Sequence, residues 1–124
     1  MIDDMKCILS KADIMIRIKE ISKRIHHDYK DNPNLVLICV LNGSFMFFND
    51  LLRELTLLRR DNILIDFIKV SSYGNEMVSS KSIKILLDLS INIENKDVII
   101  IEDIIDTRRT INFLNDHIEL KKTK

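Results

Sequence analysis

Cysteine, glycine, proline and tryptophan are all scarce in this 124-residue chain, which has two Cys, two Gly, one Pro and no Trp. The two cysteines, Cys7 and Cys39, are too few for a disulfide framework and lack the spacing of metal ligands. Average usage would give about nine Gly in a chain of this length. The composition therefore excludes a secreted disulfide scaffold, and a reducing, cytoplasmic setting fits best.

The chain also lacks a net charge and a long apolar run. Lys+Arg 19 balances Asp+Glu 19, and the pI is near 6.8. No general attraction to nucleic acid or to an anionic membrane is expected, so any phosphate binding must come from a local site. The longest apolar run, Leu35–Leu41, has seven residues and is too short to span a membrane. No apolar stretch follows the acidic start Met1–Asp4, so we expect no secretory signal.

What the chain does have is apolar material for a core, since 46% of its residues are hydrophobic. Residues 1–124 are long enough for one domain that buries roughly two-thirds of its unfolded surface. Near the start, apolar residues recur at helical spacing, with Ser10 as a cap. The predicted helix ends before Asn32-Pro33, because the residue before proline avoids the helical region. Its predicted buried stripe is Ile14, Ile18, Ile21 and Ile25.

The rest of the chain alternates strands, turns and helices. The predicted strands are Leu35–Leu41, Ile63–Val70, Ile83–Leu89 and Val98–Ile101. The predicted helices are Phe45–Leu58 and Thr110–Leu120. We expect the second and third strands to form a hairpin-like pair across the polar segment Ser71–Ser82. The pattern predicts an α/β domain with a mainly parallel sheet flanked by helices.

The stretch after the last predicted strand is the most informative for function. It contains, in order, Glu102, Asp103, Asp106, Thr107 and Thr110. Ligands of open parallel sheets bind at the carboxyl ends of strands, and the first N–H groups of a helix can hold an anion. The pattern suits a ligand with both hydroxyls and a phosphate. Alternatively, Asp106 or Thr107 is only a helix N-cap whose charge favours the macrodipole.

This stretch resembles the phosphoribosyl-pyrophosphate (PRPP) signature of type I phosphoribosyltransferases. In that signature, four apolar residues precede Glu-Asp, two apolar residues and Asp-Thr/Ser-Gly-x-Thr. Within the family, the chain is similar to the hypoxanthine-guanine phosphoribosyltransferases, and to bacterial hypoxanthine enzymes in particular. Further segments match in order along the chain: Leu41–Phe47, Asp66-Phe67 with Ser71–Gly74, Lys84–Leu89 and Glu94–Val98.

The resemblance implies roles for the signature residues. Glu102 and Asp103 would hold the ribose 2′- and 3′-hydroxyls, with Mg²⁺ bridging that diol and the pyrophosphate, partly through water. Asp106 would act as the catalytic base near N7 of the purine. The 5′-phosphate would be cradled by Asp106, Thr107, Arg108, Arg109 and Thr110.

The resemblance also implies two further parts of the site. Leu41, Asn42, Gly43 and Ser44 would bind pyrophosphate through exposed backbone, with a cis peptide between the first two of them. Ser72 and Tyr73 would close over the site and exclude water. The implied reaction is purine salvage, in which hypoxanthine, and also guanine, reacts with PRPP to give IMP or GMP and pyrophosphate. The resemblance further implies a homo-oligomer in the intact family.

Two residues depart from the family pattern. Arg108 stands where the signature has glycine; a left-handed backbone there would cost a non-glycine residue roughly 1–2 kcal/mol. The Arg108 guanidinium could instead hold the phosphate, or fill its place. Asn42 stands where the family has Lys or Arg, so a cation facing pyrophosphate is absent.

The third departure is length, since the family continues past Lys124 with further strands and the residues that bind the purine. We therefore expect a C-terminally truncated domain with an exposed apolar sheet edge, marginal stability and a tendency to pair with another chain. Two alternatives stay open. One is an inactive fragment or pseudoenzyme that retains only a PRPP or phosphate half-site. The other is an unrelated phosphohydrolase that uses Asp103 and Asp106 as a metal pair.

The remaining polar residues carry little functional signal. We expect His26, His27 and His117 to favour helix dipoles near helix ends, and no Cys/His cluster indicates zinc. Asp88 is expected to be a charge at a strand end. The lysines near the C-terminus, Lys121, Lys122 and Lys124, are expected to form a solvated tail.

Overall fold

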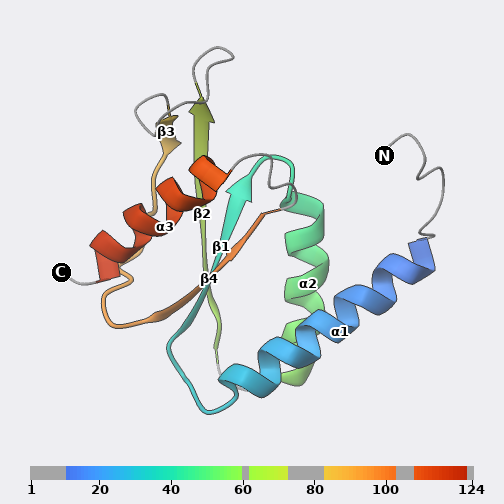
Figure 1. Cartoon of the computed structure of the whole chain (residues 1–124). Helices are drawn as coiled ribbons and strands as arrows, with labels where there is room; N and C mark the ends of the chain where they lie inside the picture. Colours follow the sequence, from blue (N-terminus) through green and yellow to red (C-terminus); the bar gives the residue numbers. More distant parts are fainter. Residues whose placement is uncertain (1–10, 60–61, 73–82, 103–107, 123–124) are drawn as a thin grey trace.

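A computed structural model describes residues 11–59, 62–72, 83–102 and 108–122, and it places a four-stranded sheet between helices (Figure 1). The elements are α1 (Lys11–Tyr29), β1 (Leu35–Leu41), α2 (Phe45–Leu58), β2 (Leu64–Ser72), β3 (Ile83–Leu87), β4 (Asp97–Ile101) and α3 (Arg108–Lys122). The predicted β1 and α2 are confirmed with the same bounds. The third predicted strand ends two residues early, because Asp88 and Leu89 already belong to the connection that follows β3.

The sheet is mainly parallel, as the sequence predicts. Its strand order is β3-β2-β1-β4, and β1 pairs in parallel with both β2 and β4. β2 and β3 are antiparallel, with a register shift between Lys69 and Val70. The predicted hairpin-like pairing of the second and third strands is therefore confirmed.

β1 divides the hydrophobic core into two parts, because successive side chains of a strand point to opposite faces. Leu35, Leu37 and Cys39 pack in one cluster with α1 and α2. Val36 and Ile38 pack in the other cluster with α3. Figure 1 shows the same layers, with α1 and α2 on one side of the sheet and α3 on the other. Six of the seven β1 residues are buried, as expected for an aliphatic strand covered on both faces.

The buried stripe of α1 differs in part from the predicted one. Ile18 and Ile25 are buried, whereas Ile14 and Ile21 are 44% and 39% exposed. Ser22 is buried instead of Ile21. Its hydroxyl donates to the Lys19 carbonyl oxygen at 2.8 Å, so this small polar side chain satisfies its own donor inside the packed face. A hydrophobicity pattern cannot identify a buried serine that is satisfied in this way.

A buried arginine closes the end of α1. Arg59 is 6% exposed and donates through Nη1 to the Tyr29 carbonyl oxygen at 2.6 Å, and through Nη2 to the Asn32 carbonyl oxygen. The last carbonyls of a helix have no intrahelical partner, and a planar guanidinium can satisfy two acceptors at once. Arg59 therefore fixes the chain reversal between α1 and β1.

A buried carboxylate fixes the connection after β3. Asp66 in β2 is 5% exposed and accepts backbone N–H bonds from Phe67 at 2.8 Å, Ser90 at 2.6 Å and Ile91 at 3.0 Å. These bonds hold residues 90–91 against the middle of the sheet. None of the helices in the described part of the chain combines the length and the apolar character needed to cross a membrane.

Candidate functional site

The predicted site segments follow the carboxyl ends of three parallel strands. Because β1 runs parallel to both β2 and β4, these three strands end on the same side of the sheet (Figure 1). Residues 41–44 lie at the end of β1, Ser72 ends β2, and Glu102 directly follows β4. This end of a parallel sheet is where ligands of open α/β folds bind.

The turn after β1 exposes its backbone. The peptide bond between Leu41 and Asn42 is cis, as the resemblance implies. Asn42 and Gly43 are exposed, and the Phe45 N–H donates to the Asn42 carbonyl oxygen at 3.2 Å. α2 begins at Phe45, immediately after this turn. The turn therefore presents peptide groups and a helix start to solvent at the carboxyl end of the sheet.

Ser44 turns its side chain inward from the same segment. It is fully buried and makes no side-chain cap on α2. Its hydroxyl donates to the Val40 carbonyl oxygen at 2.5 Å and lies 3.3 Å from the Ile101 carbonyl oxygen. The sequence resemblance groups Ser44 with residues that bind pyrophosphate through backbone. The structure engages its hydroxyl between the ends of β1 and β4.

Glu102 is the described carboxylate of the predicted set. It is half-buried and lines a groove of about 400 Å³ beside β4, together with Tyr29 and Asn115. Asp103, Asp106, Thr107 and Tyr73 lie outside the described residues. The convergence of the three predicted acids therefore stays a prediction.

The start of α3 resolves one question about Arg108. Its backbone opens α3, so it is right-handed helical, and the non-glycine residue with positive φ in the described ranges is Asn95, at 59°. The cost of a left-handed non-glycine residue therefore does not arise at Arg108. Arg109 and the half-buried Thr110 follow in the same first turn.

The donor set limits what metal the site can hold. Within residues 11–59, 62–72, 83–102 and 108–122, no three His, Cys, Asp or Glu side chains form a group that could hold a metal ion. Glu102 alone would offer one carboxylate. That arrangement fits an ion such as Mg²⁺, which keeps several waters and takes further ligands from substrate phosphates.

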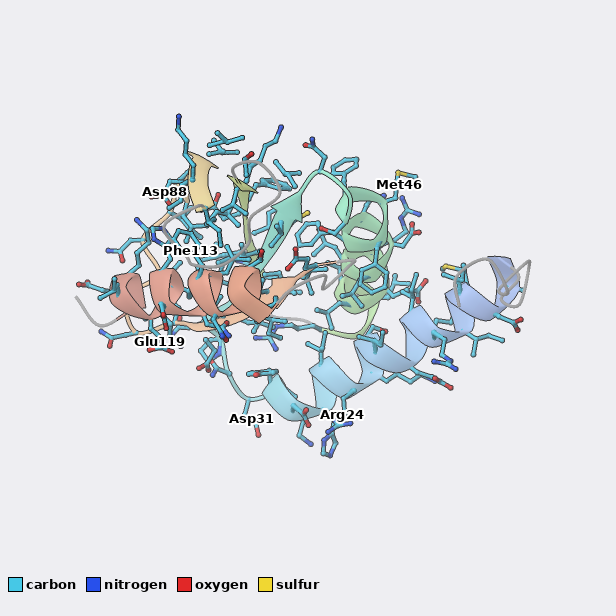
Figure 2. All side chains as sticks on the ribbon, turned by 45° about the horizontal axis from the view of Figure 1, so that its top comes forward. Arg24, Asp31, Met46, Asp88, Phe113 and Glu119 are labelled. Carbon is cyan, nitrogen blue, oxygen red and sulfur yellow. The ribbon has the colours of Figure 1, made fainter. Side chains whose placement is uncertain are left out.

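One polar cluster on the α3 face was not predicted from the sequence. The His117 Nε2 lies 2.9 Å from Asp88 Oδ1, and the Lys121 Nζ lies 3.4 Å from Asp88 Oδ2. The Phe113 ring stacks on the His117 ring with centroids 6.2 Å apart. Figure 2 shows Asp88 and Phe113 on one side of α3 and Glu119 on the other. Lys121 is thus an ion-pair partner within α3 and not part of a solvated tail.

Two opposing effects act on Asp88. Burial raises the pKa of its carboxyl, but the hydrogen bond from His117, helped by the Leu89 N–H and the Lys121 charge, holds the pKa below the ordinary 3.8. His117 and Lys121 lie four residues apart, on one helix face, which the sequence could have indicated. The sequence gives no signal that Asp88, distant along the chain, lies opposite them.

Comparison with known proteins places this chain among phosphoribosyltransferases. Residues 5–123 match the family model for the phosphoribosyl transferase domain. The chain is 45% identical over 107 residues to a hypoxanthine-guanine phosphoribosyltransferase of Dictyostelium discoideum, covering 86% of this chain and 59% of that protein. It is 38% identical over 120 residues to the Aquifex aeolicus enzyme of the same name, covering 97% and 65%.

The fold agrees with that of a solved relative. The crystal structure of a hypoxanthine-guanine phosphoribosyltransferase from Bacillus anthracis matches with a TM-score of 0.81 at 38% identity, covering 92% of this chain and 64% of that one. This chain therefore spans less than two-thirds of the length of these relatives.

Proposed function

This chain belongs to the phosphoribosyl transferase domain family, and from that we propose that it acts in purine salvage. The proposed reaction joins hypoxanthine, and also guanine, to the ribose of PRPP, giving IMP or GMP and pyrophosphate. We place the reaction in the cytoplasm, where Cys39 stays reduced, and propose that the active assembly is a homo-oligomer. The names and sequence identity of the relatives support the substrate class.

One relationship carries the proposal: the turn at 41–44 and the strand end before Glu102 are joined through the Ser44 hydroxyl. In the proposed function, the exposed peptide groups of Asn42 and Gly43 bind pyrophosphate. Glu102 accepts hydrogen bonds from the ribose hydroxyls. A leaving group and a sugar that are covalently linked in PRPP need two such subsites at a fixed separation, which the Ser44 link would maintain.

The signature residues complete the proposed mechanism. Asp103 assists Glu102 at the ribose diol, and Asp106 takes the proton as the purine nitrogen bonds to the ribose carbon. The first turn of α3, with Thr107, Arg108, Arg109 and Thr110, holds the 5′-phosphate, because its amides and the positive end of the helix dipole favour an anion. Ser72 and Tyr73 close over the site and exclude water while positive charge develops on the ribose.

We propose that Glu102 and Asp103 also hold Mg²⁺, partly through ribose hydroxyls and water. When bound, the ion neutralises charge on the departing pyrophosphate. The small number of protein carboxylates at this edge fits an ion that takes most of its ligands from substrate and water.

A second candidate function is supported by chain length. Because this chain spans less than two-thirds of its relatives, it could bind PRPP without transferring the purine. This half-site activity would use the same residues for ribose and phosphate. It differs from the first proposal in turnover and not in PRPP binding.

Calorimetric titration with PRPP and Mg²⁺, paired with a spectrophotometric assay of IMP formation from hypoxanthine, separates the two candidates. Turnover supports the transferase, whereas saturable micromolar binding without turnover supports the half-site. Glu102→Gln should weaken binding at least tenfold, because a neutral amide is a poorer acceptor for ribose hydroxyls. Glu119→Gln is the control, since Glu119 is exposed on α3 (Figure 2).

Failure to bind PRPP would contradict both candidates. Hydrolysis of a simple phosphate ester such as p-nitrophenyl phosphate, without any purine, would instead support the phosphohydrolase alternative. The assay therefore includes that ester as a third substrate.

A further inference from the structure

β4 is an edge strand with the composition of an interior strand. In the described part of the chain, it pairs with β1 on one side and with no strand on the other. Four of its five residues are Val98, Ile99, Ile100 and Ile101, and the first three of them are only half-buried. Edge strands usually carry charges, prolines or bulges that prevent pairing with another chain. β4 carries one charge, Asp97, at its start.

The opposite edge of the sheet is better protected. β3 carries Lys84 in its middle, and its pairing with β2 is interrupted by a register shift between Lys69 and Val70. A shift of this kind twists a strand and interrupts the regular pattern that a further strand would need. The two edges therefore differ, and β4 is the one suited to accept a strand.

A groove runs beside the open edge of β4. It has a volume of about 400 Å³ and is lined by residues 98–100 of β4, by Tyr29 at the end of α1, and by Ile111 and Asn115 on α3. Ile99 packs against the α1–α2 cluster, while Val98 and Ile100 pack against the α3 cluster. The two faces of β4 are thus partly covered by helices, and the space between them lies in line with the sheet.

We infer that the β4 groove binds an extended apolar strand of a second polypeptide, equivalent to the part of the relatives that this chain does not match. More than a third of the Dictyostelium and Aquifex proteins lies outside the match, although 86% and 97% of this chain lies inside it. That unmatched third must bury its own apolar side chains. The β4 edge offers it both unpaired backbone groups and an apolar groove.

The shape of the groove favours a single strand over a second copy of this chain. A strand enters between the walls formed by Tyr29 and α3 and adds one row to the sheet. A second copy would bring its own α1 and α3 against the same walls. The inference concerns assembly and holds whether or not the chain transfers a purine.

Co-expression tests the inference directly. The tagged 124-residue chain is produced together with the part of the Aquifex relative that lies outside the matched 120 residues. We expect a one-to-one complex by light scattering, and at least tenfold slower hydrogen exchange of the amides of Ile99 and Ile101, or of Val98 and Ile100. Only alternate amides of β4 face the open edge, so protection should alternate.

Two substitutions place the contact in the groove. Ile111→Glu and Asn115→Arg line it and should each weaken the complex at least tenfold, while Asn112→Glu, the exposed neighbour outside the groove, should not. Asn115 is itself exposed, so Asn115→Arg keeps the test valid if Ile111→Glu unfolds the chain. The inference is overturned if no complex forms, if neither groove variant weakens it, or if β4 becomes protected through self-association alone.

Discussion

The hydroxyl of Ser44 lies between two strand ends that are far apart in sequence: it donates to the Val40 carbonyl oxygen at 2.5 Å, and the Ile101 carbonyl oxygen lies 3.3 Å away. One side chain therefore links the turn after β1 to the residue that precedes Glu102. In the proposed site, these are the pyrophosphate and ribose subsites. The separation of the two subsites would depend on this buried serine.

Replacing Ser44 with alanine should lower the free energy of unfolding by about 1–3 kcal/mol, because two buried carbonyls lose a polar neighbour. It should also weaken PRPP binding, although no ligand contact by the hydroxyl is proposed. Urea denaturation and calorimetric titration measure the two effects. Thr56→Ala is the matched control, since that hydroxyl donates to the Arg53 carbonyl oxygen on an exposed part of α2. Equal behaviour of the two variants would contradict a linking role for Ser44.

Arg108 should contribute to phosphate binding and not hinder it. Its backbone is already helical, so glycine would relieve no left-handed conformation and would lower helix stability by up to about 1 kcal/mol. We expect Arg108→Gly to weaken PRPP binding about tenfold, and Arg108→Lys to weaken it less because a cation remains. Titration at two salt concentrations measures both. Tighter binding by the glycine variant would show that the arginine obstructs the site.

Much of the fold could be predicted from the sequence because its signals are local. The aliphatic run of β1 and the apolar residues of α2 define each element within a few neighbouring residues. The differences in α1 arise from tertiary packing. Ile21 is 39% exposed while Ser22 is buried, because the angle at which α1 meets the sheet decides which residues face inward, and no local pattern encodes that angle.

The candidate site was predictable as a list of residues but not as a geometry. The resemblance supplied the cis peptide at Leu41–Asn42, which the structure confirms. It did not indicate that Ser44 points inward, or that Asp88 pairs with His117 across the chain. Both contacts join segments that approach only after the sheet has formed, so sequence spacing carries no information about them.

The Asp88 cluster should make stability depend on pH in the acid range. A carboxyl whose folded pKa lies below its ordinary 3.8 contributes stability above that value and loses it as the pH falls through the folded pKa. Asp88→Asn should therefore be less stable than the parent near pH 5–7, and the difference should shrink below about pH 4. Urea midpoints across this range measure it. Asp116→Asn, at an exposed position on α3, is the control and should show no such convergence.

The 124-residue chain alone should be marginally stable, because its open edge leaves a row of aliphatic side chains half-buried. Val98, Ile99 and Ile100 are covered by helices on their faces but by no described strand on the β4 edge. Mesophilic domains commonly unfold at about 45–65 °C. We expect the isolated chain to unfold below about 55 °C or to associate as it is heated. Calorimetry followed by light scattering measures both, and a cooperative transition of a clean monomer above that temperature would show that β4 needs no partner. Addition of the β4-groove strand should raise the transition temperature by mass action, in proportion to the logarithm of its concentration above the dissociation constant.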